Sequence, residues 1–241
     1  MSFTLPTEIV ELPSKGLLYP EGHPLANGEI EIKYMTAKEE DILSNSNYIQ
    51  NGTVLDKLLE SVIVTKVNMN DLLIGDKNAI MVASRILGYG GEYKFTYSGK
   101  EHVVNLSEVE AKPIDDSWYT RGLNEFSYTL PATNTPITFK LLTHGDEVSI
   151  TKEVEGLKRI NKNSSNELTL RLKHLITSVG DSREPKDIKE FVDNYLLARD
   201  SRSLREYIRK IQPDVDLTFF PEGSNSRVDI PIGLSFFWPD I

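Results

Sequence analysis

The chain has 241 residues, with 36 acidic and 27 basic side chains, a formal net charge of −9 and no cysteine. Its apolar content of 39% is typical of a globular protein that can bury one large hydrophobic core or two small ones. The lack of cysteine excludes disulfide scaffolds, thiolate zinc sites, iron–sulfur clusters and thiol nucleophiles.

The first half reads as strands, helices and a hairpin. Thr36 and Glu39 form a capping box, in which the hydroxyl and the carboxylate satisfy free amides at the start of a helix. Gly88 and Ser98–Gly99 mark a helix end and a tight turn. In chain order, the expected elements are strands at 8–12 and 29–34, helices at 37–46, from Thr53 and at 76–87, and a hairpin at 92–106.

The second half starts a similar pattern after a segment that resembles a linker, at 107–121. Strands are expected at 126–130 and 137–142, helices at 145–161, 166–179, 186–198 and 201–211, and a final apolar hairpin at 215–234. The two halves also align: Ile30, Lys33, Thr36 and Glu40 fall on Ile137, Lys140, Thr143 and Glu147 at a constant offset of 107 residues. Upstream, Leu12–Pro13 corresponds to Leu130–Pro131 once the long first loop is allowed as an insertion.

Repeated order of this kind indicates a duplicated supersecondary unit, although four identities in eleven positions can also arise by chance. We therefore predict an α+β fold with two similar lobes, each a β-hairpin followed by helices and a closing β-hairpin. The predicted boundaries are residues 1–106 for the first lobe, 107–121 for the linker and 122–241 for the second lobe.

Patterns that carry enzymatic chemistry are missing from the sequence. The four histidines, His23, His102, His144 and His174, make no metal-ligand spacing, and no phosphate-binding loop or G-x-S-x-G nucleophile motif occurs. The acidic group Glu39, Glu40 and Asp41 falls at a helix start, where the helix dipole favours carboxylates. We expect no catalytic residue, no metal ion and no cofactor. The alternative is a hydrolase or transferase whose site is assembled from carboxylates between the lobes.

Basic residues concentrate in the C-terminal helices, among them Arg171, Arg202, Arg205 and Arg209. They alternate with glutamates, which is typical of solvated helix faces with ion pairs rather than of a track that binds phosphates. Nucleic-acid binding by these helices is the third hypothesis, and the net charge does not favour it. No stretch approaches the roughly 18 consecutive apolar residues of a spanning helix, so we expect no membrane span, and the N-terminus lacks the pattern of a signal peptide.

Two apolar segments are candidates for a protein interface. The loop GLLYPEGHPL and the C-terminal LSFFWP contain large apolar side chains where polar ones are common. Either these side chains fold back onto the core, or they are anchors of the kind enriched at protein–protein interfaces. The candidate interface residues are Leu17, Leu18, Tyr19, Leu25, Phe236, Phe237 and Trp238.

Several segments together resemble the baseplate-hub protein family of T-even-like contractile-tailed bacteriophages. They are LPSKGLLYPEGHPL, IEIKYMTAKEEDIL, NGTVLDKLLESVI, DLLIGDKNAIMVASRILGYGGEY and the ending FFWPD, and the likeness is densest in residues 11–95 and at the C-terminus. Members of that family are baseplate-hub subunits or hub-assembly chaperones. The resemblance transfers no enzymatic residue, and it implies that positions such as Asp76 and Arg85 serve the fold or an interface.

The resemblance implies a non-enzymatic phage tail protein that promotes or takes part in assembly of the central baseplate hub. Its partners would be other hub or tail proteins rather than a small-molecule substrate, and it would act in the host cytoplasm during assembly or remain in the virion baseplate. The alternative to a chaperone is a stoichiometric structural subunit. The sequence decides neither this choice nor the oligomeric state.

Overall fold

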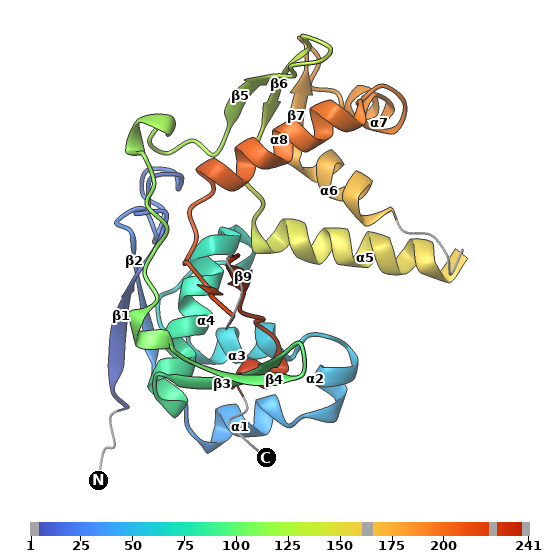
Figure 1. Ribbon diagram of the computed structural model, residues 1–241. Coiled ribbons are helices and arrows are strands. Elements are labelled where there is room, and N and C mark those ends of the chain that lie inside the picture. The colour runs from blue at the N-terminus through green and yellow to red at the C-terminus, as the bar shows by residue number, and fades with distance from the viewer. Residues whose placement is uncertain (1–4, 161–165, 222–225, 238–241) are drawn as a thin grey trace.

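The computed structural model describes residues 5–160, 166–221 and 226–237 of the chain. Over these residues the protein combines eight α-helices with small antiparallel sheets (Figure 1), which confirms the predicted α+β class. None of the helices within these ranges is both long enough and apolar enough to cross a membrane.

The first half begins with an antiparallel hairpin of β1 (Thr7–Glu11) and β2 (Glu29–Lys33). In β2 the side chains of Ile30 and Ile32 enter the core, because successive residues of a strand point to opposite faces. The helices that follow are α1 (Ala37–Leu43), α2 (Ser46–Gln50), α3 (Val54–Val62) and α4 (Ile74–Tyr89), with a short 3₁₀ turn, η1 (Met69–Asp71), before α4.

Two helix boundaries in this half differ from the prediction. The helix predicted at 37–46 is two helices, because the side chain of Asn45 caps α2 by accepting hydrogen bonds from the amides of Asn47 and Tyr48. The predicted end at Gly88 is wrong: α4 continues to Tyr89, and Gly90 adopts a φ of +84°. Gly88 instead allows close packing, because a Cβ there would lie 2.5 Å from Cε of Met35.

The hairpin after α4 agrees with the prediction. It consists of β3 (Glu92–Tyr97) and β4 (Lys100–Asn105), joined at Ser98 and Gly99. Both turn residues have positive φ, +50° and +76°, as a two-residue hairpin turn requires.

The second half contains a three-stranded sheet in the order β5–β6–β7. Its elements are β5 (Phe126–Thr129), β6 (Pro136–Phe139), α5 (His144–Ile160), α6 (Glu167–Leu175), β7 (Ile176–Val179), α7 (Pro185–Asn194) and α8 (Ala198–Ile211). The helix predicted at 166–179 is wrong in its last four residues, which form β7. Their strand conformation depends on pairing with β6, which lies far away in the sequence.

The two halves repeat one arrangement in space. In the second half α6 packs against α5 and leads into β7, which pairs with β6. In the first half α3 packs against α1, and Ile63, the residue after α3, makes a single antiparallel bridge to Ile32 of β2. The helices α3 and α6 each have nine residues and end in the same extended cap conformation, at Ile63 and Ile176.

The C-terminal segment does not close the second lobe as predicted. It contains β8 (Thr218–Phe219), β9 (Val228–Asp229) and the 3₁₀ turn η4 (Leu234–Phe237), and Figure 1 shows it leaving α8, passing α4 and ending near β3. The ring of Phe219 lies 4.8 Å from that of Phe95, and the ring of Phe236 lies 4.9 Å from that of Tyr93. The predicted second lobe, 122–241, is thus corrected: its last part packs on the first half.

The segment predicted as a linker, 107–121, pairs with this returning chain. The amide of Lys112 donates to the carbonyl of Asp214 at 2.8 Å, and the amide of Asp216 donates to the carbonyl of Glu110 at 2.8 Å. Buried apolar side chains of both halves form one continuous hydrophobic cluster. The protein is therefore built as two similarly arranged halves on a shared core.

Polar contacts also join the halves at the start of α5. The amide of His144 donates to the carbonyl of Leu72 at 2.7 Å. The buried imidazole of His144 lies 3.0 Å from Nζ of Lys77 and 3.6 Å from a carboxylate oxygen of Asp56. Burial, together with the nearby Lys77, lowers the pKa of His144, so the neutral imidazole is favoured there.

Candidate functional site

A buried carboxylate organises the junction of strand and helix in the first half. Glu39 is fully buried, and its carboxylate accepts hydrogen bonds from the amide and hydroxyl of Thr36, from Nζ of Lys33 at 2.8 Å and from the hydroxyl of Ser61 at 2.6 Å. Burial alone raises the pKa of Glu39, but these four donors outweigh it and lower the pKa to about 2. Glu39 is therefore a charged structural cap.

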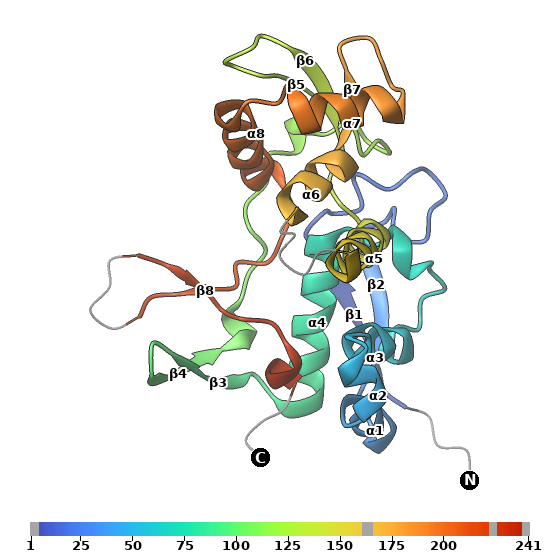
Figure 2. The same cartoon turned by 90° about the vertical axis from the view of Figure 1, so that its right-hand side faces the viewer.

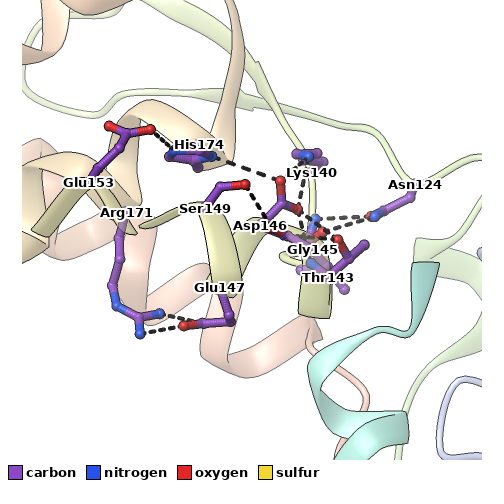
Figure 3. Close-up of polar contacts among 11 residues, drawn as sticks. Asn124, Lys140, Thr143, Gly145, Asp146, Glu147, Ser149, Glu153, Arg171 and His174 are labelled. Atoms are coloured by element: carbon purple, nitrogen blue, oxygen red, sulfur yellow. Dashed lines mark hydrogen bonds and ion pairs between the residues drawn. The ribbon is translucent and has the colours of Figure 1, made fainter. Parts of the chain in front are cut away.

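The second half has a similar cluster at the corresponding positions, with the same lysine and threonine but another carboxylate residue (Figure 3). The carboxylate of Asp146 accepts two bonds from Nζ of Lys140, at 2.7 and 2.9 Å, and others from the amide and hydroxyl of Thr143. His174 of α6 takes the place of Ser61 of α3, with Nδ1 3.9 Å from Asp146 and Nε2 3.0 Å from Glu153. The carboxyl-bearing position is Glu39 in one half and Asp146 in the other, the same offset of 107 residues.

A second pair of buried carboxylates ties each hairpin loop to a helix. Asp76, the third residue of α4, accepts hydrogen bonds from the amide and hydroxyl of Ser14 and from the hydroxyl of Tyr19. Asp200, the third residue of α8, accepts from the amide of Ala132 and the hydroxyl of Thr133. Burial raises the pKa of Asp76, and burial together with Asp76 raises the pKa of Tyr19.

The structure shows where the candidate interface residues of the loop GLLYPEGHPL lie. Leu18, Tyr19 and Leu25 are buried in the protein's own core, and Leu17 is half-buried. The prediction that Leu18, Tyr19 and Leu25 are exposed anchors is wrong, because the loop folds back and is held by Asp76, whereas an interface role for Leu17 stays a prediction. The alternative fate that the sequence left open, packing on the core, is the one observed.

The C-terminal candidates have the same fate where the structure describes them. Phe236 and Phe237 are fully buried, and Trp238 lies outside the described residues. The guanidinium of Arg85 is also buried, and it donates to the carbonyls of Phe236, Gly90 and Glu92 at 2.8 to 3.0 Å. Arg85 therefore fixes the returning chain through carbonyl oxygens rather than through an ion pair.

The carboxylate-hydrolase alternative requires reactive groups that converge in one pocket. The cleft between α6 and α8 contains two carboxylates, Glu147 and Asp214. Glu147 is held by both guanidinium NH groups of Arg171, at 2.6 and 2.7 Å, and Asp214 accepts from the side-chain amide of Asn78 at 3.0 Å. Within the described part of the chain, no group of three or more histidine and carboxylate side chains could hold a metal ion.

The open surface feature of this region is the cleft between α6 and α8, with a volume of about 400 Å³. Its floor is aliphatic and is formed by Leu168, Leu172, Leu175 and Ile208. Its rim carries Lys112, Arg171, Arg205 and Arg209 beside the two carboxylates already described. Sequence reasoning interpreted these arginines as part of solvated helix faces, and it did not identify the aliphatic floor, which is formed by residues of two helices that are far apart in the chain.

A second hollow, of about 840 Å³, lies along β3 and is lined by side chains such as Leu43, Ile49, Tyr93 and Leu234. Lys94 is among its lining residues.

Comparison of the chain with family models, with curated proteins and with solved structures found no match. The fold and the sites define the class: an α+β protein of two similarly arranged halves, in which charged clusters hold strands, loops and helices together.

Proposed function

We propose that the protein is a non-enzymatic assembly protein of a contractile phage tail, which promotes or takes part in formation of the central baseplate hub. The proposal rests first on the segments that resemble the baseplate-hub family. Two of them, around LPSKGLLYPEGHPL and DLLIGDKNAIMVASRILGYGGEY, meet in space at Asp76, where the first loop is bound to α4.

The observation that carries the proposal is that the buried charged groups serve the fold, whereas apolar hollows are open on the surface. The buried carboxylates Glu39, Asp76 and Asp200 and the half-buried carboxylate of Asp146 accept hydrogen bonds that maintain the fold. Among the hollows on the surface of the described residues are two with partly apolar walls, one between α6 and α8 and one along β3. Such surfaces suit binding of another protein.

Two modes of action follow from binding alone. A chaperone covers an apolar surface of its partner until the correct subunit displaces it, whereas a structural subunit stays in the particle. The chaperone acts in the host cytoplasm during assembly, and the subunit is also found in the virion baseplate. In both modes we propose that the protein acts by binding hub or tail proteins.

The experiment is affinity purification of the tagged full-length chain from infected cells, followed by mass spectrometry. We expect tail or hub proteins to copurify in fixed proportion to the bait, and uninfected cells provide the control. Recovery of host proteins alone, at the same level with and without infection, would remove the proposed function. Protein composition of purified particles then separates the modes, since a fixed copy number identifies the structural subunit.

A further inference from the structure

The cleft between α6 and α8 is electropositive in a protein of net charge −9. Its two carboxylates are already engaged, Glu147 by Arg171 and Asp214 by Asn78. Arg205 and Arg209 are exposed, and in the described residues neither has a carboxylate within 4.0 Å. Two cations on one rim are thus free to pair with an incoming anion.

A neighbouring arginine on the same helix behaves differently. Arg202 pairs with Glu206 at 2.8 Å, one turn along α8. It does not line the cleft. Of the three arginines Arg202, Arg205 and Arg209, the two without a carboxylate partner line the cleft, and the paired one does not.

In the first half, the helix that corresponds to α8 is α4, and the face of α4 that corresponds to the cleft side of α8 is covered. Asp76 and Asp200 hold equivalent positions, so Arg85 of α4 corresponds to Arg209 of α8 at the same offset of 124 residues. Arg85 is 2% exposed, and its Nε donates to the carbonyl of Phe236 at 2.9 Å. A short apolar segment therefore covers this face in the first half, and in the second half the face is open.

The chemistry of the lining selects the occupant. The floor is aliphatic, and none of the described residues that line the cleft is aromatic, so these residues offer no platform on which nucleic-acid bases could stack. A volume of about 400 Å³ fits a few large side chains rather than a folded domain. A bound segment would complement the aliphatic floor with apolar side chains and the arginines of the rim with carboxylates.

We propose that the cleft between α6 and α8 binds a short acidic segment of a partner protein, with apolar side chains on Leu168 and Ile208 and carboxylates paired with Arg205 and Arg209. This inference deepens the function proposed above and rests on it for the class of partner, another tail protein. The binding chemistry itself can be tested with the purified protein.

The test uses a displayed library of random 16-residue peptides selected against the immobilised full-length protein. We expect enriched peptides to carry net negative charge and at least two large apolar residues. Their affinity, measured by fluorescence anisotropy, should fall at least tenfold in Arg209→Glu and in Arg205→Glu. In the matched control Arg202→Glu, which makes the same charge change on the same helix, it should stay within twofold.

A second matched pair tests the apolar floor. Leu168→Ser should weaken the selected peptides at least fivefold, and Leu123→Ser should not, although the two leucines are similarly exposed, at 47% and 46%. Circular dichroism confirms that each variant is folded. Selection of neutral or basic peptides, equal losses in Arg202→Glu and Arg209→Glu, or Arg209-dependent binding of duplex DNA without peptide binding would each overturn the proposal.

Failure of this inference and failure of the proposed function are distinguishable. If Arg209→Glu recovers tail proteins from infected cells as well as the unmodified chain does, the cleft is not their binding site and only this proposal falls. If selected acidic peptides bind in an Arg209-dependent way but no tail protein copurifies, the cleft proposal stands and the hub-assembly function falls.

Discussion

At the residue scale, a single buried carboxylate fastens each hairpin loop to a distant helix. Asp76 is fully buried and receives three hydrogen bonds from Ser14 and Tyr19, which lie about sixty residues earlier in the chain. The carboxylate is the shared acceptor for these three donors, and each buried donor left without a partner would cost about 1–3 kcal/mol. The loop is thereby held against α4.

Replacing Asp76 tests this role. Asp76→Ala leaves the amide and hydroxyl of Ser14 and the hydroxyl of Tyr19 without their acceptor, so we expect the free energy of unfolding to fall by about 3 kcal/mol. Urea denaturation followed by circular dichroism measures it. The exposed Asp41→Ala should change stability by less than about 0.5 kcal/mol. Equal effects of the two substitutions would contradict the assignment.

Glu39 predicts a pH dependence of stability. Its pKa is lowered from 4.5 to about 2 in the folded protein, so the folded state binds fewer protons than the unfolded state between these values. The stabilisation is complete above pH 4.5 and is lost as the pH falls toward 2. A shift of this size corresponds to about 3 kcal/mol.

The measurement compares the unmodified protein with Glu39→Gln by urea denaturation from pH 7 to pH 3. We expect the stability difference to be largest at neutral pH and to shrink as the pH falls, because protonation removes the advantage of the native carboxylate. Glu8→Gln, at an exposed position, is the control. A difference that stays constant across this range would show that Glu39 is not the charged cap.

At the scale of elements, two glycines in helices have opposite roles. Gly75, in the first turn of α4, lies against the returning C-terminal segment, and a Cβ there would be 1.8 Å from the carbonyl oxygen of Pro213. Gly156 lies within α5, with no atom within 4 Å of the corresponding position. The first glycine permits a close approach of two chains, and the second only weakens a helix.

Alanine substitution should therefore act in opposite directions. Gly75→Ala forces the segment at Pro213 away from α4, and we expect a loss of at least about 2 kcal/mol. Gly156→Ala should raise stability by up to about 1 kcal/mol, since alanine has the higher helix propensity. Thermal unfolding measures both. Destabilisation by Gly156→Ala, or tolerance of Gly75→Ala, would contradict the packing described.

At the scale of the whole molecule, the returning C-terminal segment makes the two halves interdependent. Phe236 is fully buried against Tyr93, and its carbonyl accepts from Arg85 of α4. Figure 2 shows that the part with β8 projects away from α4 and that the red turn near the end of the segment lies beside α4. Together with the continuous hydrophobic cluster, this arrangement predicts cooperative unfolding rather than two independent domains.

Hydrogen exchange tests the interdependence. Phe236→Ala should cost about 3–5 kcal/mol and should accelerate exchange of the amides of α4, more than a hundred residues away in the sequence. Phe220→Ala, at a ring that is 59% exposed, is the control and should leave α4 protected. Acceleration limited to residues 122–237 would instead support the lobe boundaries predicted from the sequence.

Much of the architecture could be predicted because local chemistry decides it. The capping box of Thr36 and Glu39, the hairpin turn at Ser98–Gly99 and the alignment of the two halves depend on residues that are neighbours in the chain. The offset that placed Lys33 and Thr36 on Lys140 and Thr143 also superimposes their hydrogen bonds. A common origin for the halves remains a prediction.

The sequence by itself determined the α+β class, most helices and the repeated order of elements, because hydrophobic periodicity and capping act within a few residues. Only the tertiary structure decided the strand at Ile176–Val179, the burial of Leu18, Tyr19 and Phe236, and the open cleft between α6 and α8. These features depend on contacts between residues far apart in the chain. An apolar side chain in a loop has the same local signature whether it packs on its own core or binds a partner.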